Sequence, residues 1–232
     1  MKNLKLIFWM LLLSTIFGEI FYAQDWANLN CYRKENESIG LPSSKEKRIV
    51  FMGNSITEGW KKFCPDFFSG RPYINRGISG QTTPQMLLRF RTDVINLKPA
   101  VVVILAGIND IAGNTGPSTL EMIEDNIISM AELAAVNGIK VILCSVLPTV
   151  HFPWKPELNP AEKIIALNEL IKQYAARNGI LYLDYYSSMV DEHKGLKNMY
   201  TYDGVHPNEA GYRVMAPLIE EAIVKVVPRK ND

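Results

Sequence analysis

The sequence of 232 residues contains few cysteines and histidines and no excess of either charge. Its three cysteines are an odd number and lack the Cys-x-x-Cys spacing of zinc sites and disulfide frameworks. The 25 Lys and Arg residues balance 24 Asp and Glu residues, so nucleic acid is not an expected partner. The chain has no Gly-Lys-Ser/Thr phosphate loop and no internal repeat. With 47% hydrophobic residues, it is expected to form one ordinary globular domain.

The sequence leads to separate predictions for the burial of Cys144 and for the pairing of Cys31 with Cys64. Cys144 lies inside the apolar run IKVILCSVLP and is expected to be a buried small hydrophobic residue. In an oxidising compartment Cys31 and Cys64 could form a disulfide, but nothing in the sequence fixes the distance between them.

A run long enough for a permanent membrane span is also lacking at the N-terminus. The uncharged run Leu6–Gly18 has 13 residues, which rise only about 20 Å as a helix, against a hydrocarbon core of roughly 30 Å. Because two lysines precede this run and Ala23 follows it, the sequence predicts a signal peptide over 1–23 and export to the periplasm or the exterior. An uncleaved anchor is the alternative. We expect a polar extension over 24–47 and the folded domain over 48–232.

Five segments of strand length alternate with segments that carry helix signals. They are Arg48–Met52, Tyr73–Asn75, Ala100–Ala106, Ile139–Val146 and Ile180–Asp184. Several are continuously apolar rather than alternating, which is typical of strands covered on both faces. The pattern predicts a three-layer α/β/α sandwich around a doubly wound, five-stranded parallel sheet. Ligands of such folds bind beyond the carboxyl ends of the strands.

Capping signals predict where three of the helices begin. Thr83 with Pro84 is expected to open one helix. Ser118 with Glu121 has the spacing of a capping box for a second helix. A last helix is expected to begin at Pro207.

Three of the loops that follow strands carry candidate functional residues. Ser55 follows the first strand and has two interpretations, a nucleophile on a tight turn or a helix N-cap. Gly77 and Gly80 follow the second strand and suit either a turn whose amide points at an oxyanion or an ordinary tight turn. Asn109 follows the third strand and is either an oxyanion donor or an Asx-turn residue.

The last loop gives the strongest local signal. Asp203 precedes His206 by three residues, which allows the carboxylate to orient one ring nitrogen while the other faces a nucleophile. Two metal ligands are the alternative, without a third His or Cys nearby. Because these loops emerge at one sheet edge, their residues predict a single active site.

In this combination the chain resembles the SGNH hydrolases, also called GDSL esterases/lipases. The similarity spans 49–223. Within it, 75–110 and the segment DGVHPNEAGY look especially like the branch of the platelet-activating-factor acetylhydrolase catalytic subunits. The chain departs from the Gly-Asp-Ser-Leu motif at one functional position, where Asn54 stands in place of the aspartate. Asn54 is expected to keep the turn.

The resemblance implies a flavodoxin-like fold and roles for individual residues. Ser55 would be the nucleophile, His206 the base and Asp203 the residue that orients it. The oxyanion hole would be made by the amides of Ser55, Gly80 and Asn109. No cofactor and no metal are implied.

These residues predict a serine esterase that hydrolyses short-chain acyl esters, above all acetyl, through an acyl-enzyme on Ser55. The short acyl group and a small-molecule or carbohydrate substrate rest on the resemblance. A lysophospholipase or thioesterase would share every catalytic residue. A non-catalytic binding module on the same fold is the third alternative.

Aromatic residues near the candidate site have two interpretations. His151 and Trp154 follow the fourth strand and are candidate substrate-binding residues, or part of a loop that packs its own aromatic rings. Four others are expected on a helix face that meets the core rather than around an acyl chain: Trp60, Phe63, Phe67 and Phe68.

Overall fold

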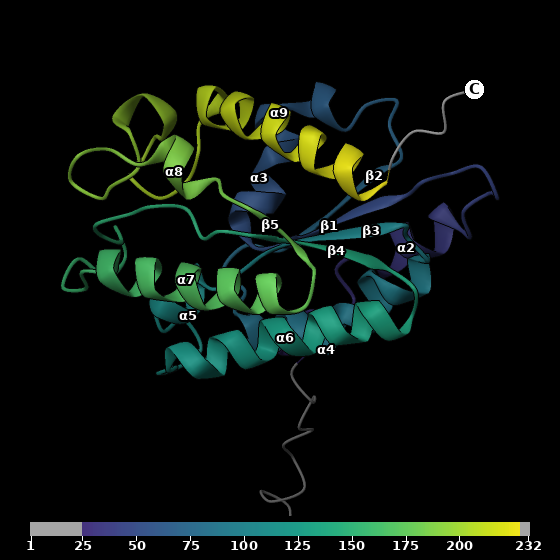
Figure 1. Ribbon diagram of the computed structural model, residues 1–232, viewed down its shortest axis with the longest axis horizontal. Coiled ribbons are helices and arrows are strands. Elements are labelled where there is room, and N and C mark those ends of the chain that lie inside the picture. The colour runs from purple at the N-terminus through teal and green to yellow at the C-terminus, as the bar shows by residue number, and fades with distance from the viewer. Residues whose placement is uncertain (1–24, 228–232) are drawn as a thin grey trace, which may run out of the picture.

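The computed structural model describes residues 25–227 as a parallel sheet covered by helices on both faces (Figure 1). The strands are β1 (Ile49–Gly53), β2 (Tyr73–Gly77), β3 (Val101–Leu105), β4 (Lys140–Cys144) and β5 (Leu181–Leu183). They lie in the order β2-β1-β3-β4-β5, and every neighbouring pair is parallel. The predicted five-stranded α/β/α fold is therefore confirmed. The predicted signal peptide over 1–23 lies outside the described residues.

The helices form a layer on each side of the sheet. The α-helices are α2 (Arg33–Ile39), α3 (Ser55–Phe63), α4 (Thr83–Asp93), α5 (Ile108–Ile111), α6 (Leu120–Val136), α7 (Ala161–Arg177), α8 (Tyr186–Met189) and α9 (Glu209–Val226). Short 3-10 helices are η1 (Pro65–Phe67), η2 (Ile95–Leu97) and η3 (Asn198–Tyr200). In Figure 1, α3 and α9 cover one face, and α4, α6 and α7 cover the other.

The core lies between the sheet and these layers. Strands β1 and β3 are buried at every position, because helices cover both of their faces. Phe51 of β1 contacts Trp60, Phe67 and Phe68 edge-on, with ring centroids 5.9, 5.7 and 5.4 Å away. These three rings are buried in the core, as predicted. Phe63 is only partly buried and packs at the edge of this cluster.

All three cysteines are free thiols. Cys64 and Cys144 are buried, and Cys31 is exposed, so the structure contains no Cys31–Cys64 disulfide. The predicted burial of Cys144 is confirmed, and burial raises the pKa of its thiol well above the usual range.

One predicted helix start is confirmed and one is displaced. Helix α4 begins at Thr83, as predicted. The predicted capping box of Ser118 and Glu121 is wrong, because the N-cap of α6 is Thr119. Its Oγ1 accepts a hydrogen bond from the Met122 amide at 3.2 Å, which shifts the cap by one residue.

The start of the last helix is also displaced. Helix α9 begins at Glu209, not at the predicted Pro207, because Asn208 is the N-cap. Its Oδ1 accepts from the Gly211 amide at 3.0 Å. Pro207 instead forms an isolated β-bridge with Thr201, which closes the preceding loop.

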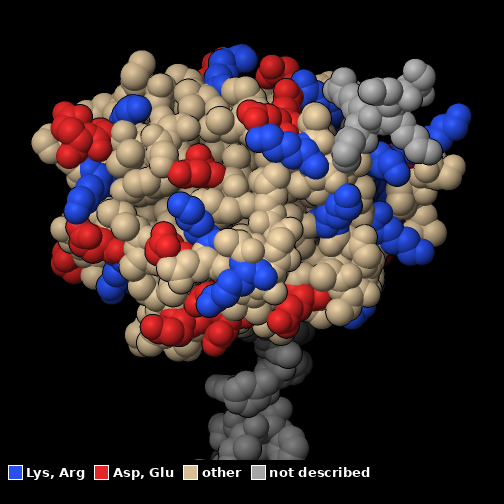
Figure 2. All heavy atoms as spheres, viewed as in Figure 1, with Lys and Arg blue, Asp and Glu red and all other residues tan. Residues whose placement is uncertain are grey.

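The described surface carries both signs of charge. Lysine and arginine side chains alternate with aspartate and glutamate across the face in Figure 2, without a large region of one sign. Within residues 25–227, none of the helices combines the length and the apolar character that crossing a membrane requires.

Candidate active site

The turn between β1 and α3 presents Ser55 at the first position of a helix. The preceding residue, Asn54, is the N-cap, and its Oδ1 accepts from the Ile56 amide at 3.0 Å. The capping role considered for Ser55 is thus taken by Asn54. Two glycines make this turn tight: a Cβ on Gly53 would lie 2.0 Å from the Thr57 Oγ1. A Cβ on Gly77 would lie 2.1 Å from the Glu58 amide nitrogen.

Ser55, His206 and Asp203 form one hydrogen-bonded relay. The Ser55 Oγ lies 2.9 Å from the His206 Nε2, and the His206 Nδ1 lies 2.7 Å from the Asp203 Oδ2. The structure brings these residues together across 151 positions of sequence. A proton on Nδ1, facing the carboxylate, leaves Nε2 to accept the serine proton.

The second carboxylate oxygen of Asp203 is held by the backbone. Oδ1 accepts from the amides of Val205 and His206, at 2.9 and 2.7 Å. Burial works to raise the pKa of Asp203, but the hydrogen bonds from His206 and Val205 together lower it below its usual value. The carboxylate is therefore charged at neutral pH and fixed in rotation about its own axis.

The loop around this pair is closed by Thr201. Its Oγ1 donates to the His206 carbonyl at 2.7 Å and accepts from the Gly204 amide at 2.9 Å. Gly204 has a φ of +85°, and a Cβ there would lie 2.7 Å from the His151 ring. The positive φ favours glycine at position 204, and a side chain there would also displace the His151 ring.

The sheet places the two predicted oxyanion loops on either side of Ser55. In the register, Gly53 pairs with Gly77 of β2 and with Leu105 of β3. The turn with Gly80 and the turn with Asn109 therefore start level with the Ser55 turn. Gly80 has a φ of +77°, a conformation that favours glycine.

Further hydrogen bonds connect these turns. The Asn109 Nδ2 donates to the Gln81 carbonyl at 2.9 Å, which uses one of the two N–H groups of that amide. The Ser79 amide donates to the Glu58 Oε2 at 3.0 Å, which joins the Gly80 turn to α3. The candidate oxyanion donors thus belong to one connected set of turns.

Aromatic rings flank the His206 imidazole. Tyr202 stacks on it with centroids 5.8 Å apart and planes 11° apart, and the Trp154 centroid lies 6.0 Å away. Both rings are exposed, at 60% for Tyr202 and 42% for Trp154. The Trp154 Nε1 donates to the Asn114 Oδ1 at 3.3 Å, and the Asn114 Nδ2 donates to the Gly80 carbonyl at 3.3 Å.

Both residues predicted from the loop after β4 thus lie at this end of the molecule, Trp154 beside His206 and His151 against Gly204. Three residues around the site were not predicted from the sequence: Tyr202, Gln81 and Asn114. Tyr202 could have been predicted, since it directly precedes Asp203 in the motif that gives the strongest local signal. Within residues 25–227, His, Cys, Asp and Glu form no group of three or more that could hold a metal ion.

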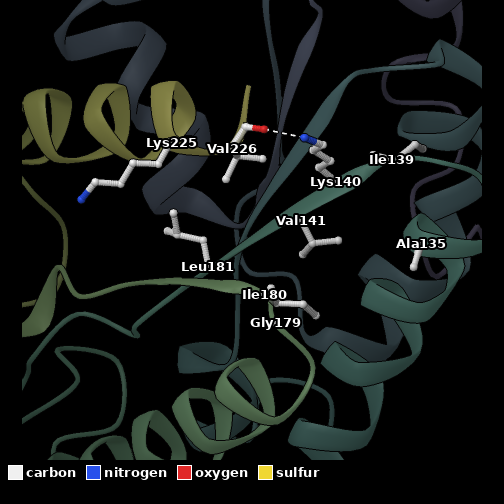
Figure 3. Close-up of a pocket in the computed structure, with 9 residues that line it drawn as sticks. All are labelled: Ala135, Ile139, Lys140, Val141, Gly179, Ile180, Leu181, Lys225 and Val226. Carbon is white, nitrogen blue, oxygen red and sulfur yellow. Dashed lines mark hydrogen bonds between the residues drawn. The ribbon is translucent and has the colours of Figure 1, made fainter. Parts of the chain in front are cut away.

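A hollow of about 660 Å³ lies at the opposite edge of the sheet (Figure 3). It is lined by residues at the amino ends of β4 and β5, including Val141, Ile180 and Leu181. Its lysines are engaged: the Lys140 Nζ donates to the Val226 carbonyl at 2.7 Å, and Lys225 pairs with a glutamate of α9. It therefore offers no nucleophile and base together, in contrast to the carboxyl edge of the sheet.

Comparison with known proteins places the chain in a family. The model of the GDSL-like Lipase/Acylhydrolase family matches residues 51–214. The chain belongs to this family. The GDSL resemblance found in the sequence is thereby confirmed, and the matched region includes Ser55, Gly80, Asn109, Asp203 and His206.

Several members of the GDSL family and other relatives are similar to this chain. The crystal structure of a GDSL-like lipase from Bacteroides thetaiotaomicron is 55% identical, with a TM-score of 0.85, and the match covers 87% of this chain and 99% of that chain. An acetylxylan esterase from Xylanibacter ruminicola is 28% identical over 225 residues, 81% of this chain and 45% of the relative. The uncharacterized lipoprotein YqeF of Bacillus subtilis is 36% identical over 81 residues, 34% of this chain and 33% of the relative. The chain thus spans less than half the length of these two curated relatives.

Asp110, next to Asn109, holds the start of α4. Its carboxylate accepts from the Thr83 amide at 2.9 and 3.1 Å and from the Thr83 Oγ1 at 2.6 Å. Burial raises the pKa of Asp110 to about 6, and the hydrogen bonds from Thr83 oppose that rise.

Asp110 is expected to make stability fall as pH rises from about 4 to 7. The folded protein keeps the proton up to about pH 6, whereas an unfolded carboxyl loses it near 3.8, so the folded state binds more protons in this interval. At 1.36 kcal/mol per pH unit between 3.8 and about 6, the free energy of unfolding falls by about 3 kcal/mol. Urea unfolding of the protein and of Asp110→Asn across this interval measures the loss, because the free energy of unfolding of the parent should fall relative to that of the variant as pH rises. A difference that stays constant with pH would contradict the assignment.

Proposed function

We propose that this protein is a serine esterase that hydrolyses short-chain acyl esters, above all acetyl esters, of small molecules or carbohydrates. The observation that carries the proposal is the relay from the Ser55 Oγ through the His206 imidazole to the Asp203 carboxylate, at 2.9 and 2.7 Å. Serine is a weak nucleophile at neutral pH without an adjacent base. The relay supplies that base and fixes its orientation.

The reaction proceeds through an acyl-enzyme. The His206 Nε2 takes the Ser55 proton as Oγ attacks the ester carbonyl carbon, and the carbonyl π electrons move to its oxygen. That oxyanion is stabilised by the Ser55 amide, the Gly80 amide and the second N–H of the Asn109 side chain. The imidazolium then protonates the departing alcohol, and His206 activates a water molecule that releases the acid.

A short acyl group is favoured by where the large aromatic residues lie. Trp60, Phe67 and Phe68 follow the nucleophile closely in sequence, but they are 2%, 5% and 8% exposed and pack on Phe51. They are therefore occupied as core and do not line a channel for a long chain. Phe63 stacks on Tyr202 instead.

A ring-shaped alcohol is favoured by the rings beside His206. Because His206 protonates the leaving alcohol, Trp154 and Tyr202 lie on the leaving-group side. Exposed aromatic faces are suited to stacking against flat apolar surfaces such as the face of a sugar ring. The acetylxylan esterase relative supports an acetylated carbohydrate as the substrate class. Export of the protein is supported by the lipoprotein relative.

The acyl preference is tested with p-nitrophenyl acetate, butyrate, octanoate and palmitate. We expect kcat/KM to be highest for acetate and to fall with chain length. A maximum at octanoate or longer would favour a lysophospholipase or thioesterase. Failure to cleave any of the four, together with saturable binding of an ester, would favour the non-catalytic binding module.

The leaving-group preference is tested by Trp154→Ala, with acetylated xylose and ethyl acetate as substrates. Loss of a stacking ring worth 0.5 to 1.5 kcal/mol is expected to raise KM for the sugar ester by about 2- to 10-fold. Ethyl acetate, which has no ring, should be unaffected. Val136→Ala is the control, since this apolar side chain is 80% exposed at the C-terminal end of α6, away from the relay. Equal effects on both substrates would contradict a sugar-binding role for Trp154.

A further inference from the structure

Residues 25–47 lie before the region that matches the GDSL family model, yet they contact the turn that carries Gly80. We refer to them as the N-terminal strap. The Tyr32 hydroxyl donates to the Gly77 carbonyl. The Gln81 Nε2 donates to the Ala27 carbonyl at 2.7 Å, and the Gln85 Nε2 donates to the Trp26 carbonyl at 2.6 Å. The strap is therefore bonded to the start, the middle and the end of the segment from Gly77 to Gln85.

Gln81 connects the strap to both candidate oxyanion donors. Its peptide directly follows Gly80, and its carbonyl accepts from the Asn109 Nδ2 at 2.9 Å. Its side chain is 3% exposed. While its Nε2 donates to the strap, its Oε1 accepts from the Arg89 Nε at 2.5 Å. Because both polar atoms of its terminal amide are hydrogen-bonded, the buried Gln81 side chain also restrains the peptides on either side of it.

Arg89 extends this connection to the turn of the nucleophile. It is fully buried and donates to the Gly53 carbonyl and to the Asp93 Oδ2, both at 3.0 Å. The Asp93 Oδ1 accepts from the Asn36 Nδ2 at 2.8 Å, and Asn36 belongs to α2 in the strap. The network therefore begins and ends in the strap. A buried guanidinium that loses a partner is costly, so the network favours one arrangement of these turns.

We propose that the N-terminal strap is a positioning element of the active site, which holds Gly80 and Asn109 where they stabilise the oxyanion. Tyr32 and Gln81 are its positioning residues. This assignment rests on the proposed esterase function. Oxyanion stabilisation depends on donors held within a few tenths of an ångström before the reaction, and small misplacements of such groups reduce kcat strongly.

Two variants remove single strap contacts and keep the surrounding packing. Tyr32→Phe loses the hydroxyl bonded to Gly77 but keeps the ring under the Arg76 guanidinium, 4.4 Å from it. Gln81→Glu keeps an acceptor for Arg89 but loses the donor to Ala27. Ser129→Ala is the control, because the Ser129 Oγ donates only within α6, to the Asp125 carbonyl at 2.8 Å, outside the strap. Asn109→Ala sets the scale, because loss of one oxyanion donor lowers kcat by about 10² to 10³.

The measurement is kcat and KM for p-nitrophenyl acetate in the full chain, with the affinity for a short trifluoromethyl ketone, which forms a tetrahedral adduct with a serine nucleophile. We expect kcat to fall by roughly 10-fold in Tyr32→Phe and in Gln81→Glu, less than in Asn109→Ala. KM should stay within about twofold, and the affinity for the ketone should fall in parallel with kcat. The thermal unfolding midpoint, recorded for each variant, should stay well above the assay temperature.

The outcomes separate the strap from the proposed function. One outcome overturns the strap assignment and leaves the proposed function standing. In that outcome the protein hydrolyses the ester and Ser55→Ala does not, but both strap variants keep the parent kcat and ketone affinity. The strap assignment is also overturned if Ser129→Ala, outside the strap, loses as much kcat as the other two variants. If the parent neither hydrolyses esters nor binds the ketone through Ser55, the proposed function and the strap assignment both fall.

Discussion

Replacement of Ser55 by alanine is expected to lower kcat for acetate esters by about 10⁶. The Ser55 Oγ is the oxygen bonded to the His206 Nε2, and alanine leaves that base without a nucleophile to activate. The oxyanion donors stay in place, so a residual acceleration of roughly 10³ to 10⁴ over water is expected. Ester hydrolysis is followed at high enzyme concentration, with mass spectrometry of the acylated protein during turnover.

A serine outside the relay provides the control for this variant. The Ser129 Oγ donates to the Asp125 carbonyl on α6, and Ser129→Ala should match the parent in kcat. An acyl group found on a residue other than Ser55, or a Ser55→Ala variant with parental activity, would show that another group is the nucleophile.

Replacement of Asp203 by asparagine is expected to lower kcat by about 10⁴, with the fold intact. The Asp203 Oδ1 accepts hydrogen bonds from two backbone amides, so the side-chain oxygen of the asparagine will occupy that position. The asparagine NH₂ group will then face the His206 Nδ1. An NH₂ group there donates to Nδ1 and places the ring proton on Nε2. The Ser55 hydroxyl then has no acceptor, because Nε2 carries a proton.

The effect of Asp203→Asn should appear in kcat at neutral pH, with little change in KM. Asp184→Asn is the matched control, since Asp184 accepts from the Ser187 amide and hydroxyl at 2.9 and 2.6 Å, outside the relay. Activity within tenfold of the parent in Asp203→Asn would mean that a group other than Asp203 orients the imidazole.

The order of strands and helices could be predicted because each element carries its own local pattern. Continuous apolar runs marked the buried strands β1 and β3, and the Thr83-Pro84 start of α4 was readable from two residues. Helix starts failed where neighbouring residues compete as caps. Thr119 displaces Ser118 by one position, and Asn208 displaces Pro207. Two neighbouring polar side chains can both reach the free amides of a helix start, so their positions in the sequence do not show which one is the cap.

The candidate residues with distinctive chemistry were also predictable, but the residues that hold them were not. Gln81 is of a type usually found on the surface, and its burial follows from partners 54 and 8 positions away, Ala27 and Arg89. The docking of the strap depends on the same long-range contacts. A polar extension is consistent with its composition, and only the folded arrangement brings it to the Gly80 turn.

The position of Ser55 at the start of α3 has an electrostatic consequence. The peptide dipoles of a helix add up to roughly half a positive charge at its N-terminus. Ser55 is the first residue of α3, so the proposed attack by its hydroxyl would take place in a field that favours negative charge on the serine oxygen and on the oxygen of the tetrahedral intermediate. This field is built from backbone amides that hold their direction before substrate arrives. It changes with neither pH nor side-chain rotation, and it acts in addition to the individual hydrogen bonds of the site.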